Sequence, residues 1–216
     1  VAGQRLHDGN GGFASHGSVS SPSNVAIHPE SGDLFIADTN NHVIRRVDKM
    51  NGVITTVAGT PGVGGYAGDG KRPTDALLYN PTCVTFTRDG QSMYIVDSWN
   101  HRVRMVRDGL INTVAGSGIP GYERDGDRAI STQLNRPSSA TVLPNGELII
   151  TDTANHRIRK VDLNGIISTI AGTGMRTEGE NALKDDGLAT GATLNYPEGI
   201  VVNENGDIFF ADRGNY

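Results

Sequence analysis

The chain has 216 residues, with 29 glycines, 9 prolines, a single cysteine and a net charge of −5. The lone Cys83 excludes an intrachain disulfide and a cysteine-based zinc site, and the negative charge argues against a general binder of nucleic acid or anionic membranes. No stretch approaches the roughly 20 apolar residues that a membrane-spanning helix needs.

Three short sequence blocks recur in the same order along the chain, which indicates tandem duplication. The first block places a proline before a short apolar run, at Pro22, Pro81, Pro137 and Pro197. The second block reads Asp-x-x-Asn-His, followed by an arginine-rich run, and begins at Asp38, Asp97 and Asp152; a fourth copy begins at Asp212, has Tyr216 in the histidine slot and is cut off there. The third block reads Val-Ala-Gly or Ile-Ala-Gly and ends at Gly3, Gly59, Gly116 and Gly172.

Each repeat contains four short runs that are typical of β-strands. In the third copy the turns between runs include Asn-Gly pairs, which supply the positive φ that a hairpin requires. Four antiparallel strands per repeat describe one blade of a β-propeller. We therefore expect an all-β chain with complete blades at 23–58, 82–115 and 138–171, an incomplete blade at 198–216, and residues 1–3 as the tail of a preceding blade.

These blocks resemble the NHL repeat, which is named for a triplet that here reads Asn41-His42-Val43, Asn100-His101-Arg102 and Asn155-His156-Arg157. The wider pattern of Asp-Gly, Leu-x-x-Pro, Asp-x-x-Asn-His-Arg-Ile-Arg and Val-Ala-Gly is similar to the long-loop form of that family. The resemblance covers 1–216 and implies a β-propeller, usually of six blades, that serves as a rigid platform. On that count the chain is an incomplete arc of one propeller, and self-association is one way to complete the ring.

The expected binding surface is the end of the blades that carries the long loops. Strand direction alternates within a blade, so the loop after the second strand and the segments between blades emerge at the same end. The long segments are 59–80, 116–136 and 172–196, and long loops on a rigid scaffold commonly carry function. We expect a non-enzymatic platform for a protein or peptide partner. Its predicted apolar anchors are Trp99, Tyr66 and Tyr122, and its predicted polar groups are Asp69, Asp125 and Asp186.

Trp99 lies in the Asp-x-x-Asn turn, at a position where the fold does not require an aromatic residue. The other copies hold Asn40, Ala154 and Gly214 in this slot. Two interpretations stay open for the tryptophan: an exposed anchor for a partner, or a ring that packs under a neighbouring long loop.

The slots that follow the repeat proline begin the innermost strand and should line the mouth of the central channel. Asn24 and Glu198 occupy such slots and are candidates to bind a ligand or a metal there, although we favour the simpler interpretation of a polar, wet channel mouth. A metal-dependent hydrolase or lyase with its site at this mouth is therefore the alternative function. No catalytic residue is identified from spacing.

The repeated polar blocks have structural interpretations that we prefer. The Asp-x-x-Asn-His block is interpreted as a hydrogen-bonded turn, because one histidine per blade cannot converge on a single ion. We interpret the arginines of the third strand as structural. Their aliphatic parts cover the apolar blade faces, and their guanidinium groups pair with aspartates of adjacent strands. A basic surface for RNA, which some NHL domains recognise, is the less favoured alternative.

The Asp-Gly pairs of the long loops lack the alternation of an EF-hand. We therefore expect no cofactor, with calcium as the one candidate. Leu78, Leu134 and Leu194 are expected to pin these loops onto the blades. The sequence does not indicate the cellular compartment.

Overall fold

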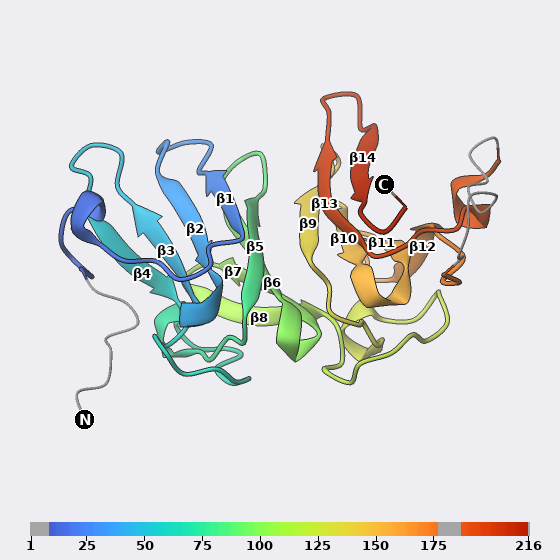
Figure 1. Ribbon diagram of the computed structural model, residues 1–216, viewed down its shortest axis with the longest axis horizontal. Helices are drawn as coiled ribbons and strands as arrows, with labels where there is room; N and C mark the ends of the chain where they lie inside the picture. The colour runs from blue at the N-terminus through green and yellow to red at the C-terminus, as the bar shows by residue number, and fades with distance from the viewer. Residues whose placement is uncertain (1–8, 177–186, 216) are drawn as a thin grey trace. The chain divides into compact units, whose positions relative to one another are not determined.

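The computed structural model describes residues 9–176 and 187–215, which contain fourteen β-strands and seven short 3-10 helices (Figure 1). The chain divides into two compact units. One comprises residues 1–100 and 104–113, and the other comprises 101–103 and 114–216. Within the described residues, no helix is long and apolar enough to cross a membrane.

The first sheet is a meander in which each strand pairs antiparallel with the next. Its strands, in spatial order, are β1 (Asn24–Ile27), β2 (Leu34–Asp38), β3 (Val43–Val47) and β4 (Ile54–Ala58). The second sheet has the same order, with β5 (Pro81–Phe86), β6 (Ser92–Asp97), β7 (Arg102–Arg107) and β8 (Leu110–Ala115). This topology is that of a propeller blade.

The core of the first unit lies between these two sheets. Phe35 and Ile44 of the first sheet share one buried cluster with Val84 and Ile95 of the second. The rings of Phe35 and Phe86 meet edge-to-face, with their centroids 4.8 Å apart. Burial of these aliphatic and aromatic side chains against the neighbouring sheet stabilises each blade.

The second unit repeats this arrangement with one complete and one two-stranded sheet. Its strands are β9 (Ser139–Val142), β10 (Leu148–Asp152), β11 (Arg157–Val161) and β12 (Ile167–Ala171), followed by β13 (Pro197–Val202) and β14 (Ile208–Asp212). Ile149, Ile158 and Ile200 lie in one buried cluster between the two sheets. The expected all-β fold of antiparallel propeller blades is confirmed.

The glycine that ends each Val-Ala-Gly block is required by a close approach of two backbones. Gly59, Gly116 and Gly172 have φ of +87°, +91° and +91°. A Cβ at Gly172 would lie 2.3 Å from the carbonyl oxygen of His156, and the same clash would arise at the other two glycines. The last strand of each blade can therefore leave the sheet only through a residue without a side chain.

The leucines expected to pin the long loops are buried. Leu78 and Leu134 are fully buried, and Leu194 is 5% exposed. Leu78 belongs to the core of the first unit and Leu194 to the cluster of the second. The prediction that these side chains fasten the loops onto the blades is confirmed.

Candidate functional site

A buried aspartate at the end of the second strand organises the loop end of each blade. Asp38, Asp97 and Asp152 are fully buried. Oδ1 of each accepts a hydrogen bond from a backbone N–H of the preceding segment, at Ser20 (2.7 Å), Tyr79 (2.7 Å) and Asn135 (2.8 Å). The asparagine three residues later donates Nδ2 to the same carboxylate, at 2.8–2.9 Å from Asn41, Asn100 and Asn155. The interpretation of this block as a hydrogen-bonded turn is confirmed.

The histidine of the same block ties the turn to the segment that enters the next blade. Nδ1 of His42, His101 and His156 accepts a backbone N–H from Asn80 (3.2 Å), Arg136 (3.1 Å) and Tyr196 (3.1 Å). Each donor directly precedes a repeat proline and has a positive φ of 47–50°. Burial lowers the pKa of all three histidines, which keeps the imidazole neutral and able to accept. The histidine is thus a structural acceptor.

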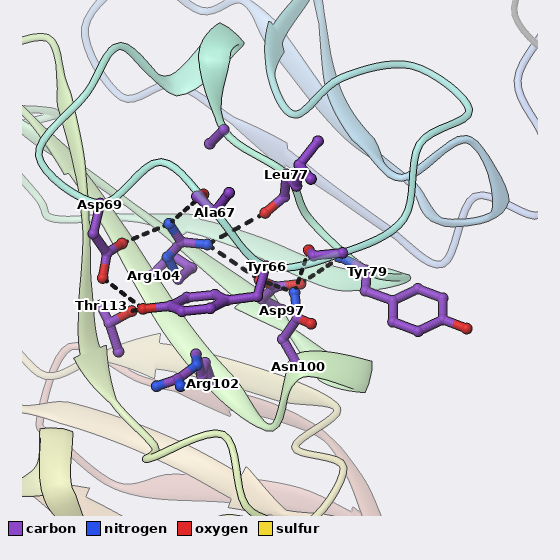
Figure 2. A network of polar contacts seen from close by, with 12 residues as sticks. Tyr66, Ala67, Asp69, Leu77, Tyr79, Asp97, Asn100, Arg102, Arg104 and Thr113 are labelled. Atoms are coloured by element: carbon purple, nitrogen blue, oxygen red, sulfur yellow. Dashed lines mark hydrogen bonds and ion pairs between the residues drawn. The ribbon is translucent and has the colours of Figure 1, made fainter.

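Arg104 is a fully buried cation held between two carboxylates (Figure 2). Its Nη1 lies 3.3 Å from Asp97 Oδ2, and its Nη2 lies 2.6 Å from Asp69 Oδ1. Burial raises the pKa of Asp97 to about 6, although its hydrogen bonds and the arginine charge act in the opposite direction. Burial also opposes ionisation of Asp69, but hydrogen bonds from Thr113 and Tyr66 and the charge of Arg104 outweigh it and lower the pKa of Asp69.

The third blade repeats this network. The guanidinium of Arg159 lies 3.3 Å from Asp152 Oδ2 and 3.0 Å from Asp125 Oδ1. Thr169 donates its backbone N–H (2.9 Å) and its hydroxyl (3.1 Å) to Asp125. Burial raises the pKa of Asp152 to about 6. The prediction that the arginine heads meet aspartates is confirmed, and these buried arginines present no basic surface.

Asp69 and Asp125, predicted as partner-binding groups, therefore fasten the long loops to buried arginines. Their side chains keep about a third of their surface exposed, at 35% and 36%. Tyr66 and Tyr122 lie beside them, with their ring centroids 5.0 Å from Arg104 and Arg159. Both rings remain exposed, at 44% and 41%. Asp186, the third predicted loop aspartate, lies outside the described residues.

Trp99 lies on the surface and belongs to an aromatic patch, which we define as His42, Tyr79 and Trp99. The centroids of Tyr79 and Trp99 are 5.4 Å apart, and His42 meets Tyr79 edge-on at the same distance. Trp99 is 45% exposed and Tyr79 is 37% exposed. Tyr79 was not predicted from the sequence, although its slot in the Leu-x-x-Pro block varies among copies as the Trp99 slot does.

The two residues predicted at the channel mouth both make polar contacts within the protein. Asn24 Oδ1 accepts a hydrogen bond from the backbone N–H of Val84 at 3.0 Å. The carboxylate of Glu198 forms an ion pair with Arg213. Among the described residues, no group of three or more His, Cys, Asp or Glu side chains is arranged to hold a metal ion.

The blades and their repeated Asp-x-x-Asn-His turns define the chain as a β-propeller repeat protein. Residues 134–161 match the model of the NHL repeat, so the chain contains an NHL repeat. This confirms the resemblance inferred from the sequence blocks.

The relatives are long proteins, of which this chain matches a part. The chain is 29% identical to the Arabidopsis thaliana protein SUPPRESSOR OF QUENCHING 1, chloroplastic, over 90% of this chain and 19% of the relative. It is 30% identical to Teneurin-1 of Mus musculus over 97% of this chain and 8% of the relative. It is 28% identical to human NHL repeat-containing protein 2 over 71% of this chain and 22% of the relative.

Solved structures share the fold at low sequence identity. An auxiliary nutrient binding protein from Bacteroides ovatus has a TM-score of 0.67 and 18% identity, over 92% of this chain and 47% of that one. A chain of a nidogen/laminin complex has a TM-score of 0.60 and 15% identity, over 92% and 61%. Virginiamycin B lyase from Staphylococcus aureus, solved with quinupristin, has a TM-score of 0.52 and 17% identity, over 89% and 49%.

Proposed function

We propose that the chain is a non-enzymatic platform that binds a protein or peptide partner at the loop end of its blades. The observation that carries this proposal is the exposed pair of Tyr79 and Trp99, whose rings lie 5.4 Å apart. Tryptophan and tyrosine are the side chains that most often anchor protein interfaces. Each offers a large apolar area together with a polar atom.

The backbone beneath this pair is held by hydrogen bonds. The N–H of Tyr79 is bound by Asp97 Oδ1 at 2.7 Å, and the N–H of Trp99 is bound by the carbonyl of Tyr79 at 3.1 Å. A site whose backbone is already ordered loses less conformational entropy when a partner binds. The repeat does not need either ring, since other copies hold Ala154 or Gly214 in the slot of Trp99 and Asn135 or Asn195 in that of Tyr79.

The structural relatives are compatible with a binding role at the level of the fold. One belongs to a complex of nidogen with laminin, and another is described as a nutrient binding protein. The fold also occurs in virginiamycin B lyase. We favour binding over catalysis because the sequence-predicted ligand Glu198 is already paired with Arg213.

The proposal is tested with peptides selected on the wild-type chain from a phage-displayed random library. The double variant Tyr79→Ala/Trp99→Ala should weaken the Kd of the selected peptides at least about tenfold, measured by biolayer interferometry. The matched control is Met50→Ala/Leu163→Ala, which removes two exposed apolar side chains (90% and 74%) from turns at the opposite end of the blades. Equal affinities of the two double variants would contradict the proposal, provided that both melt like the wild type.

A further inference from the structure

The first blade departs from the next two at its buried arginine. Arg45, Arg104 and Arg159 occupy the same repeat position, and all three are fully buried. Arg104 and Arg159 each contact two carboxylates. Among residues 9–176 and 187–215, Arg45 contacts one carboxylate, that of Asp38, at 3.6 Å, which is beyond hydrogen-bond distance.

Asn10 occupies the place of the second carboxylate in the first blade. Its Oδ1 accepts the backbone N–H of Thr56 at 2.7 Å, as Asp125 accepts that of Thr169 at 2.9 Å. The residue that follows confirms this equivalence. The N–H groups of Gly11, Gly70 and Gly126 bind the carbonyls of Ile54, Ile111 and Ile167 at 2.8, 2.8 and 2.9 Å. An uncharged amide therefore stands where the other two blades have Asp69 and Asp125.

Two groups that these aspartates satisfy elsewhere have no partner among the described residues of the first blade. Nε, Nη1 and Nη2 of Arg45 are buried and have no hydrogen-bond partner within the described part of the chain. The same holds for the buried hydroxyl of Thr56, whose counterpart Thr169 donates to Asp125. Burial lowers the pKa of Arg45, against the attraction of Asp38, since the guanidinium is desolvated without full compensation.

We propose that the first blade binds a small monovalent anion at the guanidinium of Arg45 and the hydroxyl of Thr56, beside the Asn10 amide, where the anion supplies the negative charge that an aspartate carboxylate supplies in the next two blades. Arg45 supplies the charge and the donor fork, and the hydroxyl of Thr56 adds a further donor. Asn10 is exposed, so the site borders solvent on its side. A formate ion matches the head of an aspartate side chain, and a chloride ion is a smaller ligand of the same charge.

The test compares melting temperatures in sodium formate, sodium chloride and a bulky sodium sulfonate at equal ionic strength. A ligand that binds only the folded state raises the melting temperature by mass action. We expect saturating formate to raise the Tm of the wild type by about 2–4 °C over the sulfonate. Asn10→Asp should melt higher than the wild type in the sulfonate and should show no further rise with formate. An equal formate response of the wild type and Asn10→Asp would overturn the proposal.

A second variant creates the same situation in the second blade. Asp69→Asn leaves Arg104 with the carboxylate of Asp97 alone, as Arg45 has Asp38 alone. This variant should be less stable in the sulfonate and should gain a formate response larger than that of the wild type. If Asn10→Asp fails to fold, Asp69→Asn decides the question, and a formate response no larger than that of the wild type would overturn the proposal.

Discussion

Nδ1 of His156 accepts the backbone N–H of Tyr196 at 3.1 Å, and the two rings meet edge-on with their centroids 4.6 Å apart. The bond spans 40 residues and joins the turn of one blade to the strand that starts the next. Since His42 and His101 make the same bond, the histidine of the NHL triplet is a tie between blades.

This tie makes the stability of the chain depend on pH. Burial lowers the pKa of His156 below 6.5, so protonation favours the unfolded chain. The contribution of this histidine is therefore fully present above about pH 6.5 and is lost as the pH falls toward the lower folded pKa. His156→Asn keeps an acceptor near the position of Nδ1 and tolerates the positive φ, but does not titrate.

We therefore expect the Tm of His156→Asn to fall less than that of the wild type between about pH 7 and about pH 5. Differential scanning fluorimetry across this range measures the difference. His16→Asn, at an exposed histidine, is the control and should follow the wild type. Parallel curves for the wild type and His156→Asn would contradict the loss of stability on protonation of this half-buried imidazole.

Removal of the charge from the buried aspartates should cost different amounts in the first two blades. Asp38→Asn leaves Arg45 without a carboxylate partner from the described residues, and an uncompensated buried charge costs about 3–5 kcal/mol of unfolding free energy. Asp97→Asn leaves Arg104 paired with Asp69, and the loss should be about 1–3 kcal/mol. Denaturation in urea measures both values. A cost for Asp97→Asn that equals or exceeds that of Asp38→Asn would contradict the unequal pairing of the two arginines.

The buried leucine of each long loop should carry a large share of the loop's anchoring energy. Leu134 is fully buried, so Leu134→Ala should lower the unfolding free energy by about 2–5 kcal/mol. Leu163→Ala, at a leucine that is 74% exposed, should change it by less than about 0.5 kcal/mol. Guanidinium denaturation of the two variants tests this difference, which would vanish if the loop did not depend on its leucine.

The last glycine of the Val-Ala-Gly block should not accept a side chain. Gly172→Ala brings a Cβ to 2.3 Å from the His156 carbonyl oxygen at φ +91°, so we expect a loss of about 1–3 kcal/mol. Gly191→Ala is the control, because a Cβ there meets nothing within 4 Å. Equal melting temperatures of the two variants would contradict the conclusion that the close approach of the two backbones excludes a side chain at Gly172.

The sequence was most informative where a residue performs the same backbone task in every copy. The prolines, the Asp-Asn pairs and the terminal glycines recur because each is needed for a turn, a cap or a close approach. Their spacing predicted the blades and the polar turns. The burial of Leu78, Leu134 and Leu194 followed from the same regularity.

Contacts between loops and strands could not be predicted from spacing. Asp69 and Asp125 lie 35 and 34 residues from the arginines that they bind, and only the path of the loop brings them together. Tyr79 reaches Trp99 for the same reason. The sequence also misleads at the first blade, where Asp8-Gly9 resembles the other Asp-Gly pairs while Asn10-Gly11 makes the equivalent backbone bonds.

Each histidine accepts its hydrogen bond from the main chain of its partner, so this bond does not depend on which side chain the partner carries. The donors are an asparagine, an arginine and a tyrosine with almost the same φ. At this position the backbone geometry therefore does not depend on the chemical identity of the side chain. Evolution, or a designer, can exchange the displayed group one blade at a time and obtain a new pattern of side chains on an unchanged scaffold.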